Sequence, residues 1–210
     1  MIRILIADDH ALVRRGLKQL ISETREMEVT GEAATAAEVI ANASKNNYDV
    51  IILDITMPGV NGLEILKQLK HEQPRTPILI LSFHPEEQYA VRALRAGAAG
   101  YLTKDRAPAE LIAAIRSIAR GKKYVTSSLA EKLVEAVGME FDKLPHERLS
   151  DREFEVLRLI SSGKRITEIA AELFLSPKTV STYRARILRK TGMKNSAELT
   201  HYAVTHGLVE

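Results

Sequence analysis

The chain has 210 residues, of which 45% are hydrophobic and 27% charged, and its formal net charge is +3. This composition is typical of a soluble globular protein, and the length suits one large domain or two modest ones. The absence of cysteine excludes disulfides, thiolate nucleophiles and cysteine-ligated metal sites. The apolar runs are far shorter than the roughly 18 residues of a membrane-spanning helix, and the N-terminus turns acidic too early for a signal peptide, so we expect a cytoplasmic protein without membrane contact.

The positive charge is concentrated at one end of the chain. Residues 1–121 carry 15 basic and 15 acidic side chains, residues 122–144 carry 4 of each, and residues 145–210 carry 11 basic and 8 acidic ones. The stretch between Glu172 and Glu198 holds six cations and no acidic residue: Lys178, Arg184, Arg186, Arg189, Lys190 and Lys194. Such a cluster predicts a surface that contacts phosphate groups.

Residues 1–121 alternate between strand-like and helix-like patterns. Short apolar runs predict strands at 1–7, 29–33, 50–53, 77–83 and 101–102. Helical patterns occupy 11–23, 35–44, 62–72, 85–95 and 108–120, and Thr35 with Glu38 forms a capping box at the start of the second helix. Five strands that alternate with five helices indicate an α/β fold with a doubly wound, flavodoxin-like, five-stranded parallel sheet.

The third predicted strand is an uninterrupted apolar run that ends at Asp54. Such a run is typical of a central strand covered on both faces. A loop with Pro58, Gly59, Asn61 and Gly62 follows before the next helix. Ligands collect at the carboxyl ends of strands in open α/β sheets, so Asp54 is a functional candidate. Alternatively, Asp54 serves only as the cap of the helix that begins near Gly62.

Polar side chains follow four of the five predicted strands. Asp8 and Asp9 follow the first strand, Asp54 the third, Ser82 the fourth and Lys104 the fifth. Three neighbouring carboxylates repel one another unless a cation is present, and oxygen ligands favour Mg²⁺. Together with a lysine and a hydroxyl group, the metal could cradle a phosphoryl group, with a carboxylate as the nucleophile.

Each of these residues also has a simpler interpretation. Aspartates commonly cap helices, and a lysine or serine at a strand end can be merely solvated. His10 adjoins Asp9 and could serve as a ligand or a base, but we interpret it as a half-exposed first residue of a helix. The shared position of five polar side chains at strand ends favours a common site over separate roles.

Residues 2–121 resemble the receiver domain of two-component response regulators from end to end. The motif is an acidic pair after the first strand, an aspartate with a Met-Pro turn after the third, a hydroxyl residue after the fourth, and an aromatic residue and a lysine at the fifth. In this chain these residues are Asp8, Asp9, Asp54 with Met57 and Pro58, Ser82, Tyr101 and Lys104. The resemblance implies control by a sensor histidine kinase.

The resemblance also implies a role for each charged residue. Asp54 is expected to accept the phosphoryl group as an aspartyl phosphate. Mg²⁺ is expected to bind Asp9, Asp54 and the backbone carbonyl of Thr56, with Asp8 helping through water. Lys104 is expected to pair with the carboxylate or with the phosphoryl oxygens.

A switch between two states is implied in the same way. Ser82 is expected to hydrogen-bond the phosphoryl group and to move together with Tyr101. Thr56 and His84 occupy variable positions beside the site and are expected to tune how fast the phosphoryl group is lost. Phe83 departs from the pattern, because a small residue or methionine is usual there.

Residues 122–147 lack the alternation of strands and helices and are interpreted as a helical linker. Thr126, Ser127 and Ser128 can cap a short helix, and residues 138–145 have the composition of a loop. We therefore divide the chain into a receiver domain at 1–121, a linker at 122–147 and a second domain at 148–210.

The second domain shows helical patterns throughout. Ser150 and Glu153 form a capping box for a helix to about residue 160, and a short helix follows at 167–173. Ser176 and Pro177 then begin the longest basic helix, which ends before Gly192, and a last helix covers 196–206. A basic helix that follows another helix after the short turn at 174–176 indicates a helix-turn-helix.

The basic helix has one apolar side and one polar side. Val180, Ile187 and Thr191 recur at helical spacing and are expected to face the core. The other side combines small residues, which let a helix enter the major groove, with cations that bind phosphates. A merely solvated basic helix is the alternative. The expected DNA contacts are Lys178, Thr179, Ser181, Thr182, Arg184, Ala185, Arg186 and Arg189.

Residues 148–209 resemble the LuxR-type four-helix DNA-binding domain, and the whole chain resembles the NarL/FixJ class of response regulators. In that class the helix from Pro177 is the recognition helix, and the last helix forms a dimer contact, here with Leu199, Tyr202 and His206. The segment Arg165-Ile166-Thr167 departs from the usual Ser/Thr-Asn-Lys, so the short helix is expected to lack a cap and a cation.

These observations predict a phosphorylation-controlled transcriptional regulator that binds double-stranded DNA and forms a homodimer on activation. It is not expected to be an enzyme beyond its own phosphorylation and slow dephosphorylation. One alternative is an aspartate-nucleophile phosphatase of the haloacid dehalogenase kind, although Thr56 stands where that class needs a carboxylate. The other is a receiver fold that regulates without being phosphorylated.

Overall fold

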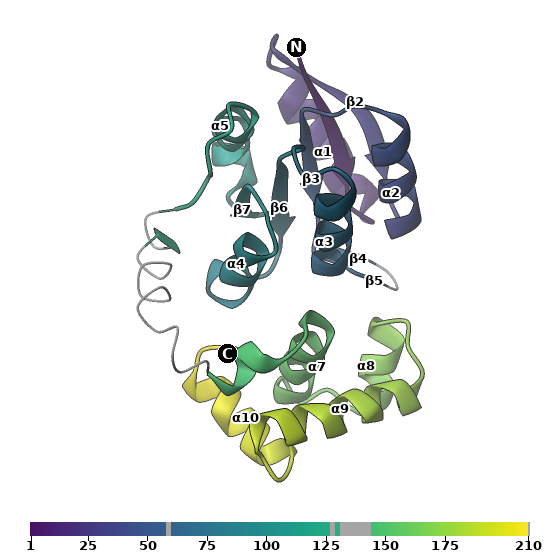
Figure 1. Cartoon of the computed structure of the whole chain (residues 1–210), viewed down its shortest axis with the longest axis vertical. Coiled ribbons are helices and arrows are strands. Elements are labelled where there is room, and N and C mark those ends of the chain that lie inside the picture. Colours follow the sequence, from purple (N-terminus) through teal and green to yellow (C-terminus); the bar gives the residue numbers. More distant parts are fainter. Residues whose placement is uncertain (58–59, 127–128, 131–143, 210) are drawn as a thin grey trace. The chain divides into compact units, whose positions relative to one another are not determined.

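The computed structural model describes residues 1–57, 60–126, 129–130 and 144–209. The chain forms two compact units, Met1–Ala130 and Glu131–Glu210 (Figure 1). The first unit therefore extends past residue 121, where the sequence places the end of the receiver domain. None of the helices in the described ranges is long and apolar enough to cross a membrane.

The first unit contains the predicted five-stranded sheet. All of its strand pairs are parallel, and the strand order is β2-β1-β3-β6-β7. The strands are β1 (Ile2–Ala7), β2 (Met27–Ala33), β3 (Val50–Leu53), β6 (Ile78–Ser82) and β7 (Gly100–Thr103). The helices between and after them are α1 (Ala11–Ser22), α2 (Ala36–Lys45), α3 (Gly62–Glu72), α4 (Glu86–Arg95) and α5 (Ala107–Ala119). The predicted α/β fold is confirmed.

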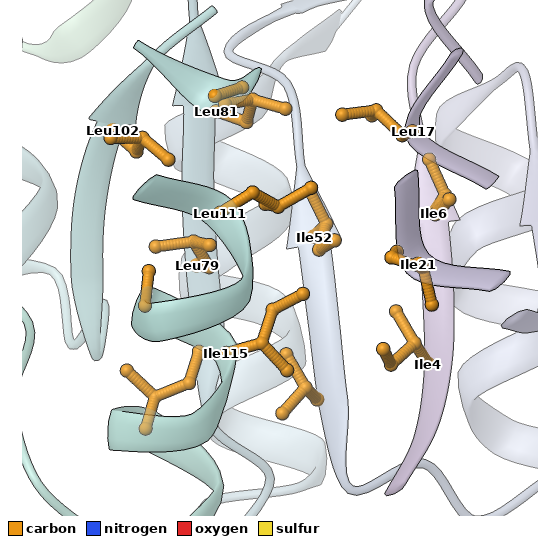
Figure 2. Packing of buried hydrophobic residues seen from close by; sticks show 14 of the residues in the cluster. Ile4, Ile6, Leu17, Ile21, Ile52, Leu79, Leu81, Leu102, Leu111 and Ile115 are labelled. Atoms are coloured by element: carbon orange, nitrogen blue, oxygen red, sulfur yellow. The ribbon is translucent and has the colours of Figure 1, made fainter. Parts of the chain in front are cut away.

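Helices cover both faces of this sheet, which explains why the central strands are apolar at every position. Alternate residues of a strand point to opposite faces, and Ile51 and Ile52 of β3 are both at most 1% exposed. Figure 2 shows the face that α1 and α5 cover, where the helix residues Leu17, Ile21, Leu111 and Ile115 pack over the strand residues Ile4, Ile6, Ile52, Leu79, Leu81 and Leu102.

A short hairpin that the sequence does not predict follows β3. Its strands are β4 (Thr56–Met57) and β5 (Val60–Asn61), which pair antiparallel. Two-residue strands show no periodicity, so pattern analysis cannot find them. Asn61 ends the hairpin and caps α3, because its side chain accepts a hydrogen bond from the Leu63 amide at 2.8 Å. The alternative that Asp54 caps this helix is therefore wrong.

The capping box at α2 differs in detail from the expected one. Thr35 accepts a hydrogen bond from the Glu38 amide at 3.3 Å, as predicted. The Glu38 carboxylate, however, accepts from the amide of Ala34, one residue before the cap, at 2.7 Å.

Residues 122–126 of the predicted linker are attached to the sheet. Tyr124 forms a parallel bridge with Gly100 of β7, and its amide donates to the Ala99 carbonyl at 2.9 Å. Thr126 accepts from the Leu129 amide at 3.2 Å, which agrees with a helix start at this point. Most of the predicted short helix and of the loop at 138–145 lies outside the described residues.

The second unit is built from helices around one apolar core. They are η1 (Pro145–Arg148), a 3₁₀ turn that the sequence does not predict, α7 (Asp151–Ser161), α8 (Ile166–Glu172), α9 (Pro177–Thr191) and α10 (Ser196–Thr205). The capping box of Ser150 and Glu153 is present, and Ser176 accepts from the Thr179 amide at 3.1 Å to cap α9. The core of this unit includes Phe154, Leu157, Ile169, Val180, Ile187, Leu199 and Ala203.

Candidate functional site

Three charged side chains meet at the carboxyl edge of the sheet. Asp8 follows β1, Asp54 follows β3 and Lys104 follows β7, and all three are buried. The Lys104 ammonium lies 2.6 Å from an Asp8 carboxylate oxygen and 2.7 Å from one of Asp54. The strand ends thus bring together residues that are 46 or more positions apart in the sequence, as predicted.

Asp9 and His10 complete this acidic rim, which we define as Asp8, Asp9, His10, Asp54 and Lys104. One possible ligand atom from each of the four acidic or histidine residues lies within 4.8 Å of the others. Within the described chain, the buried Oδ1 atom of Asp9 accepts no hydrogen bond. The His10 Nδ1 atom is 2.8 Å from it, without the alignment that a hydrogen bond needs.

His10 is half-exposed, as the sequence indicates, and its ring lies beside the carboxylates of Asp8 and Asp9. The reason is a local turn, because the His10 amide donates to an Asp8 carboxylate oxygen at 2.8 Å. That bond folds the chain back as α1 begins and brings the imidazole to the rim. The sequence feature that indicates this position of the His10 ring is an aspartate two residues before the histidine at a strand end.

The rim carries more negative than positive charge. Three carboxylates face one ammonium, so two negative charges are in excess when the imidazole is neutral. Burial, with a smaller contribution from the nearby Asp8, raises the pKa of the Asp54 carboxyl to about 6 against the opposing effect of Lys104. A divalent cation with oxygen ligands would balance this excess.

The loop after β3 holds Asp54 in place. The Thr56 amide donates to an Asp54 carboxylate oxygen at 3.1 Å, and the Gly62 amide donates to the Ile55 carbonyl at 2.8 Å. A Cβ atom at Gly62 would lie 2.3 Å from the Asp54 carbonyl oxygen and 2.6 Å from the Ile55 Cα atom. Only glycine permits this approach, so Gly62 positions the residue that the sequence singles out.

His84 connects the predicted switch residues to one another. Its amide donates to the Ser82 hydroxyl at 3.2 Å, and its carbonyl accepts from the Tyr101 hydroxyl at 2.7 Å. Its ring nitrogen lies 3.1 Å from the Thr56 hydroxyl, and the ring stacks on Tyr89 at 4.7 Å between centroids. The sequence predicts only a tuning role for His84. Its position two residues after Ser82 is the one sequence feature that indicates a link to the switch residues.

Phe83 lies outside the buried part of this arrangement. It is 67% exposed, while Tyr101 is fully buried. The Lys104 ammonium is 4.6 Å from the centre of the Phe83 ring, and His10 meets the same ring edge to face. The large side chain therefore covers the lysine and does not take up space that Tyr101 occupies.

The outward side of α9 carries the predicted DNA-contacting residues. Val180 and Ile187 are fully buried and Thr191 is half-buried, as expected for the core side. The opposite side exposes Lys178, Ser181, Thr182, Ala185, Arg186 and Arg189. The helix begins at a serine cap and ends at Gly192, whose φ of 75° is left-handed. A cation-bearing helix with a small-residue centre is thus open to a ligand.

Two cations of the basic cluster point elsewhere. The Arg184 guanidinium donates to the Ser196 hydroxyl at 2.9 Å, and the Lys190 ammonium lies 2.6 Å from a Glu153 carboxylate oxygen. Thr179 is half-buried and bonded to the Ser176 cap at 2.8 Å. The sequence stretch contains no acid, but Glu153 of α7 reaches Lys190 from outside it.

The short helix α8 begins without a side-chain cap, as the departure at Arg165 predicts. Glu168 instead accepts from the Arg165 amide at 2.7 Å, which satisfies one donor at the helix start. Phe174 in the following turn has a φ of 55° and is 67% exposed. The turn thus contains a residue other than glycine in the left-handed conformation.

The last helix requires one correction. Leu199, proposed as a dimer contact, is 0% exposed because it packs into the core of its own unit. Tyr202 is half-buried and bonded to a ring nitrogen of His146 at 2.8 Å, and it stacks on the exposed His206 at 4.0 Å between centroids. Val204 of the same helix is 53% exposed.

Comparison with known families identifies both units. Residues 4–116 match the response regulator receiver domain, and residues 147–203 match the bacterial regulatory proteins of the luxR family. The chain is 36% identical over 209 residues to the response regulator UvrY of Escherichia coli K12, and this match covers 99% of this chain and 96% of UvrY. It is 35% identical to the response regulator GacA of Pseudomonas viridiflava over 100% of this chain and 99% of GacA.

Solved structures agree with this assignment. RcsB of Salmonella enterica serovar Typhimurium, bound to promoter rprA in the presence of the phosphomimetic BeF₃⁻, is 29% identical with a TM-score of 0.66, covering 96% of this chain and 97% of that one. A LuxR-family two-component response regulator from Aurantimonas sp. SI85-9A1 is 33% identical with a TM-score of 0.61 and covers 66% of this chain. The phosphatase alternative is therefore wrong, and the chain belongs to the response regulators of the NarL/FixJ class, transcriptional regulators that join a receiver domain to a LuxR-type helix-turn-helix domain.

Proposed function

We propose that Asp54 accepts a phosphoryl group from a partner histidine kinase and that this modification controls DNA binding by α9. The observation that supports the proposal is that the Asp54 carboxylate is buried and bonded to fixed partners. Its buried carboxylate lies at the end of a central strand, 2.7 Å from the Lys104 ammonium and bonded to the Thr56 amide. A nucleophile with fixed partners needs little reorganisation when the donor arrives.

The rim suits Mg²⁺ better than a transition metal. Its excess of two negative charges and the unsatisfied Asp9 Oδ1 atom favour a hard divalent cation with oxygen ligands. We assign the binding to Asp8, Asp9, Asp54 and the Thr56 carbonyl, and we assign no ligand role to the His10 imidazole, which suits softer metals. Bound there, Mg²⁺ would neutralise the charge of the phosphoryl oxygens.

The transfer itself is a substitution at phosphorus. An Asp54 carboxylate oxygen forms the new P–O bond as the P–N bond of the donor phosphohistidine breaks, and the departing imidazole takes a proton from water. Lys104 pairs with the negative charge as it moves from the carboxylates to the phosphoryl oxygens, and the Ser82 hydroxyl on the neighbouring strand β6 donates a hydrogen bond to a phosphoryl oxygen. The side chains thus supply position and charge.

The modification adds a charge of about −2 and several hydrogen-bond acceptors. A Ser82 hydroxyl that turns to these acceptors gives up its bond to the His84 amide, and Tyr101 is bonded to the same residue. We propose that this rearrangement changes dimerisation or domain packing. We also assign residues 1–121 to the receiver, 122–147 to the linker and 148–210 to the DNA-binding domain.

On the output side, α9 is proposed to enter the major groove of double-stranded DNA. The exposed residues Lys178, Ser181, Thr182, Ala185, Arg186 and Arg189 are the assigned contacts. Thr179 and Arg184 remain proposed contacts, with the difference that each is already bonded within the unit. A two-fold dimer would place two such helices on two half-sites, with Tyr202 and His206 near the subunit contact.

Incubation with acetyl phosphate and Mg²⁺, followed by intact mass measurement and DNA titration, tests this function. The wild type should gain one phosphoryl group and change its DNA affinity, while Asp54→Asn should do neither. Asp49→Asn is the matched control, because Asp49 is an exposed carboxylate just before the same strand. A phosphoryl group on the Asp54→Asn protein would contradict the assignment of the acceptor.

A further inference from the structure

The segment that leaves the receiver is fastened along the edge of the sheet. Tyr124 continues the sheet beside Gly100, and the Tyr124 amide donates to Ala99 at 2.9 Å. A Cβ atom at Gly100 would come within 2.8 Å of the Tyr124 carbonyl oxygen, so glycine permits the close approach. The start of the connection to the DNA-binding domain thus has a defined place on the first unit.

Two carboxylates hold this segment from the side. The Thr126 hydroxyl donates to one oxygen of Glu86 on α4 at 2.6 Å, and the Tyr124 hydroxyl donates to one oxygen of Glu110 on α5 at 2.6 Å. Arg106 joins the two acids, because it donates to Glu110 at 2.9 Å and to Glu86 at 3.4 Å. We call Glu86, Arg106, Glu110, Tyr124 and Thr126 the clasp.

The clasp is built to persist in the resting protein. Glu86 is buried, so loss of its donors would leave a desolvated carboxylate. Burial, and then the bond to Glu110, raises the pKa of Tyr124 to about 12, so its hydroxyl remains a donor at neutral pH. Thr126 also accepts from the Leu129 amide, so its hydroxyl is bonded to both Glu86 and Leu129.

The clasp lies close in sequence and in bonding to the predicted switch. Glu86 is the first residue of α4 and comes two residues after His84. His84 bonds Ser82 through its amide and Tyr101 through its carbonyl. Both bonds therefore hold the backbone that leads directly into Glu86, since only Pro85 separates the two residues.

We propose that Glu86 is a positioning residue that couples the acidic rim to the interdomain connection by holding Thr126 in the resting state and releasing it on phosphorylation. This inference rests on the proposed phosphorylation of Asp54. When Ser82 turns towards the phosphoryl group, the His84 amide loses its acceptor and the start of α4 shifts. The 2.6 Å bond from Thr126 is then lost, and the connection is free to lengthen.

Amide hydrogen exchange of the full chain, with and without BeF₃⁻ and Mg²⁺, tests the clasp. The reporters are the hydrogen-bonded amides of Tyr124 and Ala130. In the wild type BeF₃⁻ should speed their exchange by about tenfold, which corresponds to one lost hydrogen bond of ~1.4 kcal/mol. Glu86→Ala should show the fast exchange without BeF₃⁻ and respond little to its addition.

Two further variants separate coupling from simple destabilisation. Thr126→Val should behave like Glu86→Ala, whereas Thr126→Ser keeps the hydroxyl and should restore the wild-type response. Glu64→Ala is the matched control, because Glu64 is an exposed acid in the first turn of α3 and is not part of the clasp. It should leave exchange at Tyr124 and Ala130 unchanged.

The outcomes distinguish failure of the clasp from failure of the proposed function. If BeF₃⁻ changes exchange nowhere near residues 53–57 and 82–84, the rim does not accept a phosphoryl mimic and the proposed function fails. If those residues respond while Tyr124 and Ala130 keep their exchange rates, or exchange more slowly, the release of Thr126 is refuted. The clasp is equally refuted if Glu86→Ala exchanges at these amides like the wild type in both states.

Discussion

The acidic rim and the outward side of α9 are both charged, but their charges are held in opposite ways. In the rim, Asp8, Asp54 and Lys104 come from three strand ends and satisfy one another below the surface. On α9, Lys178 and Arg189 belong to one continuous helix and are exposed to solvent. The first arrangement depends on the fold of the whole unit, and the second depends on a single helix.

This difference separates the roles of charge in stability and in binding. A buried carboxylate without its cation has no water to solvate it, so removing one rim partner destabilises the folded state. An exposed arginine is equally well solvated in the folded and unfolded chain, so its removal is felt mainly by a ligand. We therefore expect rim variants to change stability and metal binding, and variants of the exposed contact residues assigned on α9 to change DNA affinity with little effect on stability.

Replacement of Lys104 should have the largest effect on stability. Lys104→Met leaves the carboxylates of Asp8 and Asp54, whose side chains are 3% and 2% exposed, without their ammonium partner. We expect a loss of about 3–5 kcal/mol in the free energy of unfolding, measured by urea denaturation with a chelator present. Added Mg²⁺ should restore part of the loss, because it neutralises the same carboxylates.

An exposed lysine pair provides the comparison for that measurement. Lys18 lies 2.8 Å from a Glu32 carboxylate oxygen, with side chains 55% and 38% exposed. Lys18→Met should cost less than about 1 kcal/mol. Equal losses for the two variants in the absence of metal would mean that the rim carboxylates are not dependent on Lys104.

The pH dependence of the rim should have the next largest effect. Burial raises the pKa of Asp54 from 3.8 to about 6, so the folded state binds this proton more tightly than the unfolded state. The resulting stability is complete below about pH 4 and is lost as the pH rises through 6. Relative to Asp54→Asn, the metal-free wild type should therefore lose on the order of 3 kcal/mol between pH 4 and 7.

Urea denaturation of both proteins at closely spaced pH values, with a chelator, measures this difference. Asp49→Asn serves as the control for the loss of a carboxylate at an exposed position just before the same strand. With Mg²⁺ present, the wild type should recover stability above pH 6, where Asp54 is ionised. A stability difference that is constant from pH 4 to 8 would show that Asp54 has an ordinary pKa in the folded protein.

Local patterns made most of the fold predictable. The apolar run of β3, the capping box of Ser150 and Glu153, and the serine cap of α9 each depend on residues within a few positions of one another. The rim was predictable for a related reason, because parallel strands end at a common edge and each strand end was visible in the pattern. Asp8, Asp54 and Lys104 needed no knowledge of detailed contacts to be placed together.

The contacts that the sequence does not predict involve partners that are distant in the sequence. Glu153 reaches Lys190 across 37 positions, and Glu86 reaches Thr126 across 40, so no local pattern announces either bond. Leucine occurs in interfaces and in cores alike, so its residue type does not show where Leu199 lies. The packing of α10 on α7 places it in the core. The link that His84 makes between Ser82 and Tyr101 depends on the Tyr101 hydroxyl, which comes from another strand.

Loss of an exposed cation from α9 should have the smallest effect on stability and a clear effect on binding. Arg189→Ala should change the free energy of unfolding by no more than about 0.5 kcal/mol, because the side chain is exposed in the folded state. If Arg189 binds a phosphate, DNA affinity should fall, and the slope of log K against log salt should decrease by about 0.9. DNA titrations at several salt concentrations measure both quantities.

The neighbouring Lys190 offers a matched control with the opposite expectation. Its ammonium lies 2.6 Å from Glu153, whose side chain is only 4% exposed, so Lys190→Ala leaves a poorly solvated carboxylate. Stability should fall by about 1–3 kcal/mol, while the salt dependence of DNA binding stays close to that of the wild type. If instead Lys190→Ala lowers the salt slope and Arg189→Ala does not, the surface that contacts DNA is a different side of α9 from the one assigned here.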